Sequence, residues 1–226
     1  YMHFDLLRLY GYGNWEQRSS ELNNKYTIPY ALEISKEAPA QVTGNEAIRF
    51  ILNDLTDAAN LLREYDPVTQ KHNFSEYANV NTDGFYNTRN LRLNYYAVKA
   101  LMARAYMWKE DYSKAKECAI EVIEEVADEK NPLFPLCTAT YADTASNDNM
   151  FATEVLFSLY NSIRTDNIYK TYFTSDLNVV NLLTLAGGYQ NGRIRTIFES
   201  PDDLRFKMWE SVTKEGKEFC CFKKYA

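Results

Sequence analysis

The chain has 226 residues, 46% of them hydrophobic and 25% charged, and it carries a formal net charge of −6. This is an ordinary globular composition with enough apolar residues for a sizeable core, in one or two domains. The absence of a basic block excludes nucleic acid and an anionic membrane surface from the expected partners, and no apolar run reaches the roughly 18 residues of a membrane span.

The first predicted helix covers residues 1–10, where Phe4, Leu7 and Tyr10 recur at helical spacing. No Ser, Thr, Asp or Asn stands before it as an N-cap, and the chain ends without a turn signal. We therefore expect a fragment, so that any targeting segment would lie outside this chain. A long insertion, residues 11–45, follows, and an insertion of over roughly 15 residues between packed helices is usually functional or a protruding loop.

The second predicted helix covers residues 46–63. Thr43 and Glu46, three residues apart, form a capping-box pattern at its start, and Pro67 lies just beyond its end. We expect this helix to pair with the first helix across the insertion. Its apolar residues fall at i, i+3, i+4 and i+7 and form one stripe, which consists of Ile48, Ile51, Leu52, Leu55, Ala58, Ala59 and Leu62.

Two further helices are predicted at 91–109 and 112–127, joined by a hinge that reads "KED". A connection this short forces the two helices into an antiparallel hairpin. Ala103 on the first arm, and Ala115 and Ala119 on the second, are small enough to let the two backbones approach closely. The alanines therefore indicate contact points in a tight helical hairpin.

The spacing of small and aromatic residues around this hinge is close to that of a tetratricopeptide (TPR) unit. Tyr106 takes the aromatic position, and we expect Tyr106 and Tyr112 to fill the space beside the hinge. The glycine usual near such a hinge is absent, so Asp111 is expected to cap the second arm. Trp108, within the hairpin, is expected to belong to the core.

From residue 128 onward the pattern becomes mixed. Residues 154–161, "EVLFSLYN", alternate enough for a short strand, and Ser200 with Pro201 is placed to start a short helix. The later run "KEGKEFCCFKKY" is typical of a turn that leads into a strand. Trp209 is expected to be a core residue.

These patterns predict a mostly α fold. TPR-like antiparallel helical hairpins with a long inserted loop occupy residues 1–127. A mixed, loop-rich region with short strands follows at 128–226, as part of the same larger domain.

The chain offers little for metal or catalytic chemistry. The segment "NVNTDG", 79–84, resembles the start of an EF-hand loop, but Asn90 stands where the bidentate Glu is needed. No nucleophile elbow and no converging pair of carboxylates stands out, so neither a cofactor nor an enzymatic activity is expected. Buried free thiols are favoured over a metal site or a disulfide for the four cysteines, which lack CxxC spacing and nearby histidines: Cys118, Cys137, Cys220 and Cys221.

Five segments occur in this order along the chain: "YMHFDLLRLYG", "IPYALEI", "NDLTDAANLL", "RLNYYAVKALMARAYMWKEDYSKAKECAIEVI" and "TEVLFSLYNS". They are followed by "DDLRFKMW" and "FKKY" near the end. Together they resemble the SusD/RagB family of outer-membrane lipoproteins of the Bacteroidetes, in the order that the family has them. The combination of "HFDLLRLYG" with "KALMARAYMWKEDY" and the later "EVLFS" is fairly specific.

The resemblance implies a surface-exposed lipoprotein of the outer membrane that is not an enzyme. Such proteins are tethered by an N-terminal lipid, cap a TonB-dependent SusC-like transporter and help to capture glycans or other nutrients before import. Their TPR units form a scaffold that largely meets the transporter, while loops outside it form the ligand surface. Relative to the family, this chain lacks the lipidated cysteine region and the C-terminal part.

Two aromatic loops are the candidate ligand-binding segments, "YGYGNWEQR" (10–18) and "GGYQNGR" (187–193). Sugar capture without catalysis needs flat apolar rings flanked by amides and hydroxyls, and both loops contain such residues. The alternative is that these rings pack back onto the scaffold. The candidate ligand-binding residues are Tyr12, Asn14, Trp15, Tyr189, Gln190 and Asn191.

Two other classes of function stay open on the sequence. One is a TPR-like adaptor that binds a protein or peptide and has no role with sugars. The other is a hydrolase, for which no pair of residues stands out.

Overall fold

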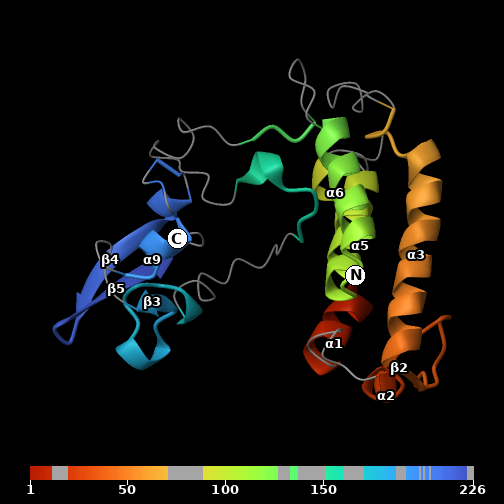
Figure 1. Ribbon diagram of the computed structural model, residues 1–226, viewed down its shortest axis with the longest axis horizontal. Coiled ribbons are helices and arrows are strands. Elements are labelled where there is room, and N and C mark those ends of the chain that lie inside the picture. The colour runs from red at the N-terminus through yellow and green to blue at the C-terminus, as the bar shows by residue number, and fades with distance from the viewer. Residues whose placement is uncertain are drawn as a thin grey trace. The chain divides into compact units, whose positions relative to one another are not determined.

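The computed structural model describes residues 1–11, 20–70, 89–126, 133–136, 151–159, 171–186, 192–198, 200, 202–203 and 205–222. The chain divides into two compact units. The helical unit consists of residues 1–135 and 155–159, and the sheet unit of residues 136–154 and 160–226 (Figure 1). The protein is mostly helical, with few and short strands, as the sequence predicts.

Helix α1 (Met2–Tyr10) and helix α3 (Gly44–Tyr65) confirm the first two predicted helices. Tyr1, before α1, makes no side-chain capping bond. At the start of α3 the predicted capping box is present, because the Thr43 hydroxyl accepts a hydrogen bond from the Glu46 N–H at 3.2 Å and the Glu46 carboxylate accepts one from the Thr43 N–H at 2.9 Å. Helices α1 and α3 pack together as expected.

Helix α5 (Tyr95–Trp108) starts four residues later than the predicted start at residue 91. A single 3₁₀ turn, η2 (Arg89–Leu91), precedes it, and Asn94 forms the N-cap, its side-chain oxygen accepting from the Ala97 N–H at 2.9 Å. The side chain of Asn94 is fully buried, so its amide also needs acceptors, and it donates to backbone carbonyls on both sides of the cap. This buried cap sets the start of α5.

Helices α5 and α6 (Tyr112–Val126) form the predicted antiparallel hairpin, and they lie side by side in Figure 1. Ala105 and Ala115 are buried, while Ala103 and Ala119 are half-buried. Small side chains therefore occupy the hairpin interface, as the alanine pattern indicates.

The hinge between α5 and α6 confirms one prediction and corrects another. The Asp111 carboxylate accepts from the Lys114 N–H at 3.3 Å and so caps α6 as expected. Tyr106 is half-buried beside the hinge, but the prediction for Tyr112 is wrong, because its side chain is 57% exposed. Tyr112 is the first residue of α6, and its side chain lies on the outer face of that helix.

The predicted insertion contains secondary structure of its own. Helix α2 (Ser20–Asn23) is followed by strands β1 (Tyr26–Pro29) and β2 (Gln41–Thr43), which pair antiparallel. Strand β2 leads directly into α3, and the connection between the strands, residues 31–40, is exposed throughout. The inserted segment thus attaches a small hairpin to the N-terminal end of α3.

One core lies between α1, β1, α3, α5 and α6 in the helical unit. Trp108 packs at its edge, with its ring edge-on to that of Phe4 at 6.4 Å between centroids. The largest fully buried apolar side chains of this core are Phe4, Leu7, Ile48 and Val68.

The predicted strand at 154–161 is wrong for the part that the structure describes. Glu154 ends the 3₁₀ turn η3 (Ala152–Glu154), and residues 155–159 pair with no other strand. This segment instead packs against the helical unit, where the Ser158 N–H donates to the Leu91 carbonyl at 2.8 Å. Leu156 of this segment packs against the helical core, whereas Leu159 is 82% exposed.

The sheet unit contains strands β3 (Thr184–Ala186), β4 (Trp209–Lys214) and β5 (Lys217–Phe222), in the antiparallel order β3-β5-β4. Glu215 and Gly216 join β4 to β5 with positive φ angles of 53° and 73°, as a two-residue type I′ hairpin turn requires. The predicted turn into a strand is thus confirmed.

The helix predicted to start at Ser200 is reduced, among the described residues, to the 3₁₀ turn η5 (Phe206–Met208), because the chain is already extended in β4 from Trp209. Trp209 is half-buried and packs, as expected, against a second core. That core consists of Ile194 from the short helix α9 (Ile194–Ile197), Phe206 and Cys220. A 3₁₀ turn, η4 (Val179–Asn181), precedes β3.

The cysteines that the structure describes are buried free thiols, as predicted for Cys118, Cys220 and Cys221. Cys137 lies outside the described residues. Burial raises the pKa of the Cys220 thiol to about 11, which keeps it protonated at neutral pH.

Candidate functional site

The residues predicted to bind ligand all lie outside the described part of the chain, as does the EF-hand-like segment 79–84. They are Tyr12, Asn14, Trp15, Tyr189, Gln190 and Asn191. Described residues of the helical unit nevertheless line at least two pockets.

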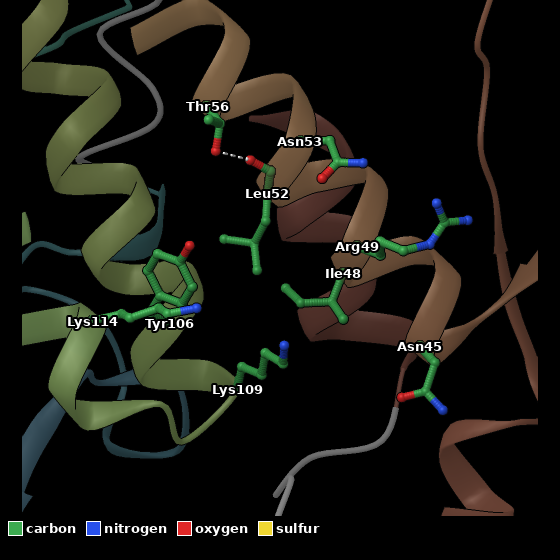
Figure 2. A pocket seen from close by; sticks show the side chains of 9 residues that line it. All are labelled: Asn45, Ile48, Arg49, Leu52, Asn53, Thr56, Tyr106, Lys109 and Lys114. Carbon is green, nitrogen blue, oxygen red and sulfur yellow. Dashed lines mark hydrogen bonds between the residues drawn. The ribbon is translucent and has the colours of Figure 1, made fainter. Parts of the chain in front are cut away.

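The first, which we call the hinge pocket, lies between α3 and the hinge of the α5–α6 hairpin and has a volume of about 360 Å³. Figure 2 shows α3 on one side and the hinge helices on the other, with Ile48 and Leu52 directed toward the hinge and Arg49 and Asn53 directed away from it. The residues that line it are Asn45, Ile48, Arg49, Leu52, Asn53, Thr56, Tyr106, Lys109 and Lys114.

Helical spacing explains what α3 contributes to the hinge pocket. Ile48 and Leu52 are four residues apart, belong to the buried stripe, and form an apolar floor that faces the hairpin (Figure 2). Asn45, Arg49 and Asn53 repeat at the same spacing one residue further round the helix, so they form a polar rim along that floor.

The hinge contributes one aromatic ring and two ammonium groups. Tyr106 is half-buried, and the ammonium of Lys114 lies 5.5 Å from the centroid of its ring. Lys114 also lies 3.8 Å from the carboxylate of Asp111, with 57% of the lysine side chain exposed. Lys109 is the C-cap of α5, and its side chain rises from the hinge toward Ile48 (Figure 2).

Several polar groups around the hinge pocket are available to a ligand. In the part of the chain that the structure describes, the side chains of Asn53 and Lys109 make no hydrogen bond or ion pair. The Arg49 guanidinium lies 4.4 Å from the centroid of the Phe50 ring and interacts electrostatically with Glu46. Thr56 is occupied, because its hydroxyl donates to the Leu52 carbonyl at 2.7 Å. Amides and cations beside an apolar floor suit a small polar or anionic ligand.

The second pocket, of about 410 Å³, lies under the connection between β1 and β2. Its main ring, Tyr30, is only 6% exposed, because it stacks on His3 at 4.0 Å between centroids. The Tyr30 hydroxyl donates to Asp54 at 2.6 Å, and burial together with this bond raises the pKa of Tyr30. With its ring covered and its hydroxyl paired, this pocket offers a ligand less than the hinge pocket does.

Glu46, which also lines the second pocket, is occupied as well. Hydrogen bonds from the Thr43 N–H and hydroxyl lower the pKa of its carboxyl, as expected of a capping-box glutamate. This carboxylate therefore serves the start of α3.

Sequence reasoning missed the hinge pocket, and in particular Arg49, Asn53 and Lys109. The only signal was the four-residue spacing of polar side chains beside the apolar stripe of α3, together with a lysine at the hinge. Because the outer face of any amphipathic helix is polar, this spacing does not distinguish a pocket from a solvated surface.

Among the described residues, no helix is long and apolar enough to cross a membrane. In the same residues, no three His, Cys, Asp or Glu side chains come together as a metal ion would need.

No protein-family model matches the chain, and no curated protein matches it. Among solved structures, the chain is similar to a SusD superfamily protein from Bacteroides vulgatus, with a TM-score of 0.60 and 21% sequence identity. The similarity covers 98% of this chain and 44% of that protein, so this chain spans less than half of the length of its structural relative. The chain therefore has a SusD-like fold.

Proposed function

We propose that this SusD-like chain belongs to a non-catalytic, surface-exposed lipoprotein of the outer membrane that captures glycans for uptake. Its partner in this role is a TonB-dependent transporter of the SusC type, and its membrane attachment is a lipid outside the chain described. The observation that carries the proposal is the structural likeness to a SusD superfamily protein over 98% of the chain.

The chemistry of the helical unit is compatible with capture of a sugar. The hinge pocket combines an apolar floor, Ile48 and Leu52, with the amides of Asn45 and Asn53. Pyranose C–H groups pack on apolar surface, while amides bind hydroxyls. Its lining contains cations and amides but no carboxylate, whereas glycoside hydrolysis needs two converging carboxylates.

A second candidate function is a scaffold for protein interaction. The observation that favours it is a pair of large apolar side chains that α1 exposes seven residues apart, and therefore on one face of the helix, namely Met2 at 79% and Leu9 at 74%. Exposed apolar side chains that gather on one surface mark docking sites. Glycan capture is the better supported of the two, because the fold likeness spans both units.

The test of the proposed function is affinity electrophoresis of the full-length protein through gels that contain a panel of polysaccharides. We expect at least one polysaccharide to retard the protein, and the double variant Tyr12→Ala, Trp15→Ala to lose most of this retardation, because the two aromatic rings supply the flat apolar surface on which sugar rings pack. Tyr65→Ala is the matched control, since Tyr65 is 70% exposed at the end of α3 and belongs to neither candidate loop.

Two outcomes would contradict glycan capture. Unchanged mobility of the wild-type protein across the whole panel would leave the protein-interaction scaffold as the better interpretation. Release of reducing sugar from a polysaccharide of the panel by the purified protein would instead indicate a hydrolase.

A further inference from the structure

We propose that the hinge pocket binds the anionic group of an acidic saccharide, a carboxylate or a sulfate ester, through Lys109 and Lys114. The saccharide part of this inference rests on the proposed function. The anion-binding part rests on the residues of the hinge pocket alone. It adds a class of ligand and a binding site on the helical scaffold, separate from the two aromatic loops.

The charge of the hinge pocket is opposite to that of the chain. Three of its nine lining residues are cations, Arg49, Lys109 and Lys114, and none is acidic. The whole chain has 25 Lys and Arg against 31 Asp and Glu, so an average surface of this protein is acidic. A local reversal of charge in a concave site attracts anions and repels cations.

The acidic groups nearest to the pocket compensate its cations only in part. Glu46 is held in the capping box of α3 and interacts electrostatically with Arg49, while Glu110 and Asp111 at the hinge do not line the pocket. Asp111 lies 3.8 Å from Lys114 in an exposed pair, and such pairs are weak because water screens them. A ligand anion can therefore replace the Asp111 carboxylate as the ion-pair partner of the Lys114 ammonium.

Both lysines line the pocket from the hinge side. Lys109 rises from the hinge toward the apolar floor, and the ammonium of Lys114 lies beside the Tyr106 ring, whereas Arg49 lies at the far rim (Figure 2). Lys109 has no ion-pair partner in the described part of the chain, so binding an anion breaks no existing bond of its side chain. Charged hydrogen bonds of this kind are stronger than neutral ones.

The rest of the pocket suits the sugar that carries the anion. A volume of about 360 Å³ holds a single sugar unit rather than a chain. The half-buried Tyr106 ring offers apolar surface to one face of the sugar, since Ile48 and Leu52 are only 2% and 8% exposed, and Asn53 at the rim offers an amide to a hydroxyl. The pocket is therefore suited to one acidic sugar residue of a longer glycan.

The anion is tested first, without any sugar. The full-length protein, labelled with ¹⁵N, is titrated with sodium sulfate against sodium chloride at equal ionic strength. We expect saturable shifts at the backbone amides of Lys109 and Lys114 with sulfate alone, and loss of these shifts in Lys109→Gln. Lys116→Gln, on the exposed face of α6, removes the same charge elsewhere and should leave the shifts unchanged. Shifts that do not saturate would overturn the proposal.

The saccharide is then tested by calorimetry with oligogalacturonate and with its methyl ester, which is the same sugar without the charge. We expect the acid to bind about tenfold more tightly, and Lys109→Gln to remove about that factor for the acid alone. Equal affinity for acid and ester, or equal loss of both in Lys109→Gln, would overturn the anionic assignment while leaving glycan capture intact. If no polysaccharide or oligosaccharide binds, the proposed function fails, and the sulfate titration alone decides whether the pocket binds anions.

Discussion

Asp66 shows how a single buried side chain ties together segments that are distant in the sequence. It is 2% exposed, and its two oxygens accept hydrogen bonds from the guanidinium of Arg89 at 3.0 and 2.7 Å and from the backbone N–H groups of Val68 and Tyr95 at 3.1 and 2.9 Å. The carboxylate thus joins the end of α3 to the start of α5. All of its strong acceptor positions are used, as burial of a charge requires.

Replacing Asp66 with Asn should destabilise the protein strongly. The substitution removes the negative charge and leaves the Arg89 guanidinium buried without its partner, which costs about 3–5 kcal/mol in comparable pairs. The free energy of unfolding, measured by urea titration, should fall by that amount.

Asp5→Asn is the control for Asp66→Asn, because Asp5 pairs with Arg8 at 3.2 Å in an exposed ion pair within α1. Exposed pairs of this kind contribute about 0–1 kcal/mol. Equal unfolding midpoints for the two variants would contradict the role assigned to Asp66.

At the scale of the element, the hinge of the α5–α6 hairpin shows how a tight turn forms without its usual glycine. Glu110 has a φ of 63°, in the left-handed region that a glycine adopts freely, while the preceding Lys109 remains helical at −78°. The Asp111 cap restarts the helix immediately afterwards. The hairpin therefore keeps its geometry at the expense of strain in one residue.

Glu110→Gly should relieve this strain and stabilise the protein by about 1 kcal/mol. The left-handed conformation costs about 1–2 kcal/mol for a residue with a Cβ, and the greater flexibility of glycine in the unfolded chain offsets part of the gain. The melting temperature, followed by circular dichroism, should rise.

Glu110→Ala removes the same carboxylate but keeps the Cβ, so it should gain less than Glu110→Gly. Lys109→Gly, at the neighbouring helical position, should lower the melting temperature. A glycine at 110 that lowers the stability would show that the backbone there is not strained.

The elements themselves were predictable where their signals are local. The stripe and capping box of α3, the "KED" hinge and the Asp111 cap each depend on residues within about four positions of one another. The start of α5 and residues 155–159 were not predicted correctly, because both depend on contacts between distant segments. The Asn94 side-chain amide donates to the Leu156 carbonyl, and the Leu156 side chain packs against the helical core rather than in a sheet.

At the scale of the molecule, each unit has a core of its own. The helical unit buries residues from α1, α3, α5 and α6 around Phe4 and Leu7, whereas the sheet unit buries Ile194, Phe206 and Cys220. The β1–β2 connection at 31–40 is exposed along its whole length. Local stability should therefore differ widely along the chain.

Native-state hydrogen exchange measured by NMR should reveal this difference. We expect the slowest amides in α5 between Leu101 and Ala105, where four of the five residues are buried or half-buried, and rapid exchange at residues 32–36. Rapid exchange in α5 under native conditions would contradict the assignment of the core.

The amino-acid sequence alone was enough to predict the helices of the first half, their caps, the hairpin and, through the resemblance, the SusD-like fold. These features follow from hydrogen bonds and periodicities within one turn of helix, or from the order of segments along the chain. The buried pairing of Asp66 with Arg89 and the hinge pocket became visible only in the folded structure. Residues 45–56 and 106–114 form one pocket because α3 packs against the hairpin. In the sequence alone, their polar side chains cannot be distinguished from those of any solvated helix face.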